Sequence, residues 1–174
     1  MMEILENKAR WSEEYRAGWL AHQKKTGEAN WGIYNRPTNN LTPGLPGIKL
    51  NEDRLMLISS AGGYLLGHQE AFDAPSPYGD YTVRTFPSDT PFDALAFAHD
   101  HYDLTYVTQD PQVALPLHHL KELVTEERIG KLAPSIVSIM GYQPDSARVV
   151  DETIPQILSI AEEQAVQAAL LAPV

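Results

Sequence analysis

Residues 55–63 carry the strongest structural signal in the chain: an apolar run, Leu55-Met56-Leu57-Ile58, followed by Ser59-Ser60-Ala61-Gly62-Gly63. A short continuous apolar run is typical of a strand buried on both faces, as the strands of parallel sheets are. The glycine-rich sequence after it predicts a tight loop at the carboxyl end of that strand. Further short apolar runs that predict buried strands occur at 81–86, 94–98, 136–140 and 168–174.

Helical patterns lie between those runs. Apolar residues recur with helical spacing over 116–130. Thr153 followed by Gln156 is the pattern of a capping box, which predicts that another helix begins there with Pro155 in its first turn. Strands that alternate with helices predict an α/β, Rossmann-like domain over residues 51–174, with a mainly parallel sheet and flanking helices.

The N-terminal part predicts an amphipathic helix joined to that domain by an irregular arm. Trp11, Tyr15 and Trp19 recur at helical spacing within residues 1–28, a stripe more typical of a core or a subunit contact than of a ligand site. Residues 29–50 are rich in glycine, proline and asparagine, which favour turns and extended backbone. We therefore predict a helix at 1–28, a connecting arm at 29–50 and one α/β domain after it.

The composition argues against several classes of function. The 174 residues hold 13 Lys and Arg against 23 Asp and Glu, a net charge of −10, which disfavours nucleic acid and membrane surfaces as partners. No apolar run is long enough to span a membrane and the N-terminus lacks a hydrophobic signal core, so we predict a cytoplasmic protein. The sequence holds no cysteine, which excludes disulfides, thiolate metal sites and cysteine nucleophiles within it.

The densest polar cluster follows the predicted strand 94–98. There, His99, His101 and Asp103 alternate with Asp100 and Tyr102, and extended backbone would project the first three to one side. Two imidazoles and a carboxylate at a strand end could hold a divalent metal or transfer protons, and they could also simply tie loops together by hydrogen bonds. We expect them to converge on one pocket, as catalytic residues or metal ligands.

A second group of candidates would contact the substrate. Arg84 could clamp a substrate carboxylate or pair with Asp80, four residues earlier. Ser60 and Gly62 lie in the loop after a strand, where backbone N–H groups can face a ligand. We expect Arg84 or Asp80 to lie within reach of the histidine cluster.

The H-x-H-x-D spacing is similar to that of metallo-β-lactamase-type hydrolases. Their signature continues with another histidine, where this chain has Leu104. Further metal ligands could come from His68, His118 or His119, although His119 is expected to face solvent from a helix.

A longer series of motifs runs in order from about Leu41 to Val174. It comprises the strand and loop of 57–63, Phe72-Asp73, Gly79-Asp80, Arg84, Pro87, His99-Asp100-His101-Tyr102-Asp103, Asp110-Pro111, Pro116, Leu120, Glu122-Leu123, Ile129-Gly130, Ala133-Pro134 and Met140-Gly141-Tyr142. In order and spacing these motifs resemble the glycine/sarcosine/betaine/D-proline reductase selenoprotein B family. The N-terminal helix lies outside the resemblance.

The resemblance implies reductive cleavage of a C–N bond in a small amino-acid-like substrate by a multi-subunit enzyme. It implies that a selenocysteine or cysteine performs the redox chemistry and that a partner subunit supplies a pyruvoyl group. The chain encodes neither redox residue and no cofactor of its own. The family places its redox residue directly after a strand that resembles 166–174, so we expect either a UGA codon after Val174 or a true stop with the remainder on another chain.

Three functional hypotheses follow. The first is a subunit or fragment of a selenoprotein B-like reductase. The second is a non-catalytic binding or assembly subunit, and the third is a metal-dependent hydrolase that uses the H-x-H-x-D loop. An apolar strand at 168–174 would leave a sheet edge uncovered, so we also expect a second subunit or a homo-oligomer.

Overall fold

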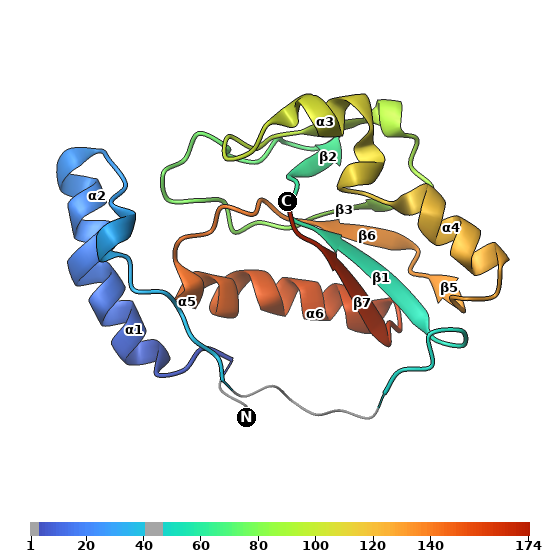
Figure 1. Cartoon of the computed structure of the whole chain (residues 1–174), viewed down its shortest axis with the longest axis horizontal. Coiled ribbons are helices and arrows are strands. Elements are labelled where there is room, and N and C mark those ends of the chain that lie inside the picture. The colour runs from blue at the N-terminus through green and yellow to red at the C-terminus, as the bar shows by residue number, and fades with distance from the viewer. Residues whose placement is uncertain (1–3, 41–46) are drawn as a thin grey trace.

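The structure is a computed structural model that describes residues 4–40 and 47–174. It is an α/β fold with a mainly parallel sheet, flanking helices and an N-terminal helix beside the sheet (Figure 1). The predicted fold class is confirmed, while its Rossmann-like character stays a prediction. Part of the predicted connecting arm, residues 41–46, lies outside the described residues, as do residues 1–3 of the predicted helix.

The main sheet is built around β1 (Arg54–Ser59), the apolar run that stood out in the sequence. Along one side, β1 pairs in parallel with β7 (Ala168–Ala172); along the other it pairs in parallel first with β5 (Lys131–Leu132) and then with β6 (Ser135–Ser138). The edge strand β3 (Arg84–Pro87) pairs antiparallel with β6, so the strand expected at 81–86 begins later than predicted.

A second, two-stranded antiparallel sheet lies at the carboxyl end of β1. It pairs β2 (Gly63–Leu65) with β4 (Leu95–Phe97), so the run at 94–98 forms a strand outside the main sheet. The sequence did not predict β2, because it is short and lies within a glycine-rich segment.

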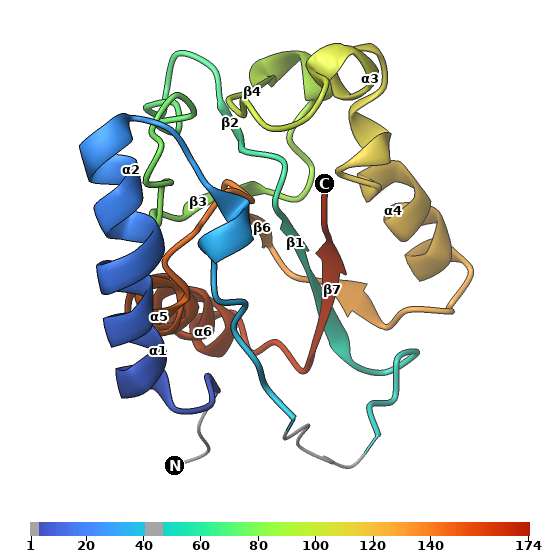
Figure 2. The same cartoon turned by 60° about the vertical axis from the view of Figure 1, so that its left-hand side comes forward.

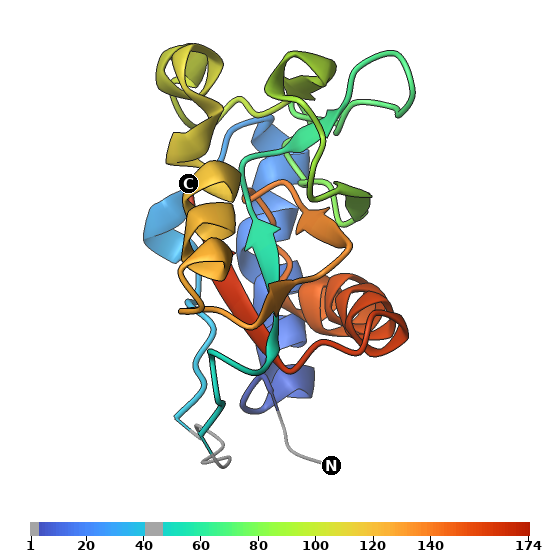
Figure 3. The same cartoon turned by 90° about the vertical axis from the view of Figure 1, so that its right-hand side faces the viewer.

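Two helices cover opposite faces of the main sheet, as Figure 3 shows for α4 (Leu117–Thr125) and α6 (Ile154–Glu163). Alternate residues of β1 divide between these layers, as strand geometry requires. Leu55 and Leu57 pack in the cluster on the α4 side, and Met56 and Ile58 pack in the cluster on the α6 side. The remaining short elements are α3 (Leu104–Gln109) and 3₁₀ turns at Trp31–Ile33, Phe92–Ala94 and Pro111–Val113.

The helix that leads to α6 begins earlier than the capping-box pattern indicates. Asp145 caps α5 (Ser146–Arg148) by accepting the backbone N–H groups of residues 147 and 148, and a π-helical turn at Val149–Thr153 continues directly into α6. The predicted helix start at Thr153 is therefore wrong, because a stronger cap lies upstream. Thr153 is instead buried inside the helix.

The N-terminal helix is continuous through α1 (Lys8–Tyr15), a π-helical turn (Arg16–Leu20) and α2 (Ala21–Thr26). Trp11, Tyr15 and Trp19 are buried and stacked in sequence, and their cluster includes Ala147 of α5. The aromatic stripe is therefore part of a core, and it packs the N-terminal helix across α5 (Figure 2). No helix in residues 4–40 or 47–174 has the length and apolar character needed to cross a membrane.

Strand β7 is more exposed than its sequence predicts. Only Ala168 is buried, while Leu170 and Leu171 are 38% and 69% exposed. Within the described residues β7 pairs with β1 alone, so its other edge has no strand partner. The buried strand expected here is thus an edge strand with apolar residues on both faces.

Candidate functional site

The loop after β1 is built around Gly62, whose φ of +71° favours glycine. Its N–H donates to the Ile139 carbonyl at 2.9 Å and its carbonyl accepts the N–H of Ala98 at 3.0 Å. A Cβ at this position would lie 2.3 Å from the Ala98 carbonyl oxygen. Gly62 therefore joins the carboxyl end of β1 to the segment that carries the histidines, and its N–H is already in use.

Ser60, two residues before Gly62, also connects neighbouring segments through hydrogen bonds. Its N–H donates to the Ala172 carbonyl at 3.2 Å, and its carbonyl accepts the N–H of Gly141 at 2.9 Å. Its hydroxyl accepts the N–H of Val174 at 2.9 Å. These bonds hold the ends of three strands together, whereas substrate binding by Ser60 and Gly62 stays a prediction.

His99 points into the protein and is only 4% exposed. Its Nδ1 accepts the backbone N–H of His101 at 3.0 Å, and its Nε2 is buried without a hydrogen-bond partner in the described part of the chain. Burial lowers the pKa of His99 below its usual value, nearby His101 lowers it further, and Asp100 opposes both. His99 is therefore a neutral imidazole at pH 7.

His101 is exposed, and its ring meets that of His99 edge-on with 5.7 Å between centroids. Its ring stacks on that of Tyr142, which follows β6, with 3.8 Å between centroids. Tyr102 donates its hydroxyl to the Ala61 carbonyl at 2.9 Å, and its ring centroid lies 4.7 Å from that of His99. Burial raises the pKa of Tyr102 to about 12, so its hydroxyl remains protonated.

Asp103 does not join the two histidines. The chain stops being extended after β4, and Asp103 becomes the N-cap of α3, where its carboxylate accepts the N–H of Thr105 at 2.9 Å. The expectation of three side chains on one side of extended backbone is therefore wrong. No group of three His, Asp or Glu side chains in residues 4–40 and 47–174 is placed to hold a metal ion.

The other histidines do not supply the missing ligands. His119 is exposed, as predicted, with its Nδ1 3.5 Å from Glu122 on the same helix. His118 packs beside Phe92, and His68 is exposed in the loop after β2. None of them belongs to a metal-binding group in the described residues.

Asp80 and Arg84 are bridged by the hydroxyl of Thr82, which donates to Asp80 and accepts from Arg84 at 2.7 Å. Arg84 also donates to the Glu70 carbonyl at 3.1 Å and lies over the Phe72 ring. Burial opposes ionisation of Asp80, but hydrogen bonds from Thr82 and the N–H of Asp73, with the charge of Arg84, hold its pKa below the usual value. Arg84 is therefore neither free to bind a substrate carboxylate on its own nor paired directly with Asp80, because Thr82 bridges the two side chains.

Arg84 and His101 lie at opposite ends of one small apolar cluster. Phe72, under the Arg84 guanidinium, packs in a cluster with Met140, and Tyr142 packs against that cluster while stacking on His101. The structure thus places Arg84 in the same region as the histidines, without a direct contact to them among the described residues.

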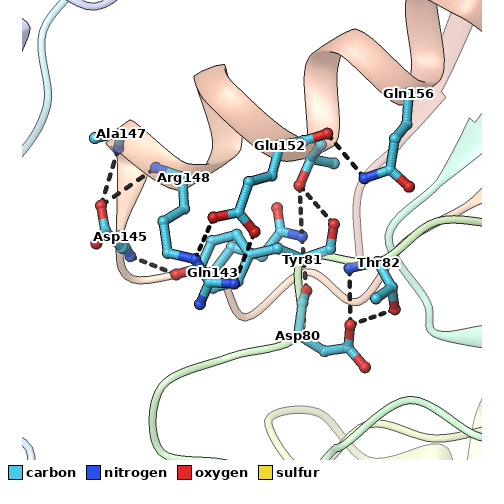
Figure 4. A network of polar contacts seen from close by, with 10 residues as sticks. Asp80, Tyr81, Thr82, Gln143, Asp145, Ala147, Arg148, Glu152 and Gln156 are labelled. Atoms are coloured by element: carbon cyan, nitrogen blue, oxygen red, sulfur yellow. Dashed lines mark hydrogen bonds and ion pairs between the residues drawn. The ribbon is translucent and has the colours of Figure 1, made fainter.

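A polar network fixes the Asp80–Thr82 segment to the helix beyond β6 (Figure 4). Gln143 donates to the Asp80 carbonyl at 2.8 Å, and the buried hydroxyl of Thr153 donates to the Tyr81 carbonyl at 3.0 Å. The hydroxyl of Tyr81 accepts the N–H of Asp145 at 2.7 Å. Sequence patterns gave no signal for this network, because its partners lie more than 60 residues apart.

Tyr142 is a residue of the candidate site that the sequence analysis did not single out. The sequence places it shortly after a predicted buried strand, and the same kind of position indicated the histidine cluster.

Comparison with known proteins identifies the family. The family model for glycine/sarcosine/betaine reductase selenoprotein B matches residues 36–173. The glycine reductase complex component B subunit gamma of Carboxydothermus hydrogenoformans is 31% identical over 99 residues, an alignment that covers 55% of this chain and 22% of that protein. No solved structure matches the chain. Since the family model covers most of the sequence, the chain belongs to the glycine/sarcosine/betaine reductase selenoprotein B family.

Proposed function

We propose that this chain forms the part of a selenoprotein B-like reductase that binds a small amino acid. The reaction implied by the family resemblance is reductive cleavage of the substrate's C–N bond. The observation that carries the proposal is the stacked pair of His101 and Tyr142, which follow β4 and β6 and lie within the region of family similarity. Ligands of open α/β sheets bind at such strand ends.

Two side chains would contact the substrate directly. His101 is exposed, and Tyr142 fixes its ring orientation. Arg84 carries the positive charge that suits a substrate carboxylate, and Thr82 with Asp80 orients it. Asp103 would act indirectly by setting the start of α3.

The redox group would come from outside these 174 residues. The sequence holds no cysteine, so no side chain here can supply a thiol for the reduction. We propose that the selenol or thiol lies outside these residues and that a partner subunit supplies the pyruvoyl group. The chain would then be one component of a complex, as the name of its relative describes for that protein.

Binding can be tested by NMR titration of the isotope-labelled chain with glycine, sarcosine or betaine. We expect saturable shifts at residues 98–103 and 140–142. Replacement His101→Ala should weaken binding about tenfold, because one directional contact is lost. His119→Ala, an exposed histidine on α4, is the matched control and should bind as the natural chain does. Equal binding by both variants would contradict the proposal.

A non-catalytic assembly role is a second candidate, favoured by β7. Leu170 and Leu171 are exposed on opposite faces of a strand whose outer edge is unpaired within the described residues. Sedimentation velocity should then show association that rises with concentration, and Leu171→Glu should abolish it. A natural chain that stays monomeric at every concentration would count against this role.

A further inference from the structure

The two ring nitrogens of His99 lie in different hydrogen-bonding environments. Nδ1 accepts the backbone N–H of His101 at 3.0 Å, so Nδ1 must present a lone pair. In a neutral imidazole the single proton then resides on Nε2. A local backbone hydrogen bond therefore fixes the tautomer of His99.

The resulting Nε2–H group is a buried donor without an acceptor. His99 is 4% exposed, and Nε2 has no partner among the described residues. Tyr102, whose ring centroid lies 4.7 Å from that of His99, donates its hydroxyl to the Ala61 carbonyl and makes no hydrogen bond to Nε2. Buried polar groups are normally paired, so an unpaired donor beside a candidate site requires an explanation.

We propose that His99 is a neutral hydrogen-bond donor that offers its Nε2–H to an oxygen of a bound ligand, and that it is neither a metal ligand nor a general base. A metal bound at Nε2 would need a lone pair on that nitrogen, so the ring proton would have to move to Nδ1. The Nδ1 proton would then point at the backbone N–H of His101, and two donors would face each other. A general base would need a lone pair directed at the substrate, and the lone pair of His99 is directed at His101 instead.

The ligand oxygen belongs to a carboxylate, and this part of the inference rests on the proposed function. Neutral His99 suits such a partner because it donates a hydrogen bond without needing a charge of its own. Arg84 lies across the apolar cluster of Phe72 and Met140, so its positive charge would act on this carboxylate at a distance and not by a hydrogen bond shared with His99. No proton moves in this arrangement, since His99 binds and orients the ligand.

The tautomer can be measured without any substrate. Long-range ¹H–¹⁵N correlation spectra of the ¹⁵N-labelled chain report which nitrogen of each histidine carries a proton, and the His99 signals are those missing from a His99→Gln spectrum. We expect the pure Nε2–H form at pH 7, unchanged by added Zn²⁺. An Nδ1–H form, a protonated ring at pH 7 or a Zn²⁺-dependent shift of His99 would overturn the proposal.

Ligand binding is tested separately, with sarcosine as the probe. The Nε2–H proton of His99 should shift as sarcosine is added, and acetate, which shares only the carboxylate, should shift the same proton. His99→Gln keeps an N–H donor near the position of Nε2 and should retain binding, whereas His99→Leu should weaken it about tenfold. His118→Leu on α4 is the control.

The outcomes separate this inference from the proposed function. If sarcosine binds at His101 while the His99 proton stays unmoved, an internal water is its acceptor and the donor role is overturned, but the proposed function stands. If sarcosine does not bind at all, the proposed function and the ligand role fail together, while the tautomer remains decided by the first experiment.

Discussion

The imidazole ring of His101 lies nearly flat against the ring of Tyr142, with 21° between their planes. Trp31 contacts Tyr142 edge-on, with 6.1 Å between the two ring centroids. Trp31 precedes the region of family similarity, which begins at residue 36. A segment outside that region thus supports a residue of the candidate site.

Replacement Trp31→Ala should loosen His101 while leaving the fold intact. Trp31 is 52% exposed, and an edge-on aromatic contact contributes about 1 kcal/mol. We expect the NMR ring signals of Tyr142 and His101 to shift toward random-coil values. Trp31→Phe should restore most of the natural spectrum, and His119 should not respond to either change. Unchanged His101 signals in the alanine variant would show that the contact has no influence.

Replacement Gly62→Ala should destabilise the chain far more than Gly67→Ala. Both glycines have a positive φ, +71° and +75°, which costs about 1–2 kcal/mol for alanine. Only at Gly62 would the new methyl group collide with backbone, at Ala98, whereas nothing lies within 4 Å at Gly67. Urea unfolding should therefore show a loss on the order of 3 kcal/mol or more at Gly62 and about 1–2 kcal/mol at Gly67. Equal losses would mean that the loop moves aside readily.

Replacement Thr153→Val should cost about 1–3 kcal/mol, because it leaves the buried Tyr81 carbonyl without its donor. The two side chains have similar shapes, so little packing is lost. Thr125 makes a similar hydrogen bond to the Lys121 carbonyl, but on the exposed surface of α4. Thr125→Val should therefore change the free energy of unfolding by less than about 0.5 kcal/mol. Comparable losses at both positions would argue that the network at Tyr81 contributes little.

Stability should fall as the pH drops through about 6.5, and His99 should be one cause. The pKa of His99 is lowered in the folded protein, by burial and by His101 against the opposing charge of Asp100. Below the unfolded value near 6.5, the unfolded chain therefore takes up a proton that the folded chain resists. His99→Gln should show a shallower decline between pH 7 and pH 5 in urea unfolding, while His119→Gln should follow the natural curve. Parallel curves for all three proteins would contradict this assignment.

Sequence patterns predicted the elements that depend on local hydrophobic runs. The run in β1 is buried on both faces and lies centrally in the sheet, as parallel pairing requires. Patterns failed where two local preferences compete. Asp103 could extend an alternating row or cap a helix, and the cap is what forms. Thr153 could start a helix, but the cap at Asp145 and the distant carbonyl of Tyr81 determine its role.

The sequence predicted where the candidate site lies in the fold, but it did not predict how its side chains are arranged. A polar cluster after a strand predicted that His99 and His101 lie near the carboxyl end of β1, although β4 belongs to a separate two-stranded sheet and Gly62 makes the connection. The burial of His99 and the stacking of His101 depend on Tyr102, held by the Ala61 carbonyl, and on Tyr142, held after β6. No spacing rule within residues 99–103 contains that information.

The helix formed by α5, the π-helical turn at 149–153 and α6 packs against two separate hydrophobic clusters. Ala147 and Val150 face the aromatic cluster of the N-terminal helix, whereas Ile157 and Ile160 pack against the sheet. Each residue of a helix adds about 100° of rotation, so deleting a single codon within the turn would rotate one half against the other by that angle. Either the N-terminal helix or the sheet would then lose its partner surface. A change of length in this turn should therefore disrupt the fold more than a substitution at one of its exposed positions.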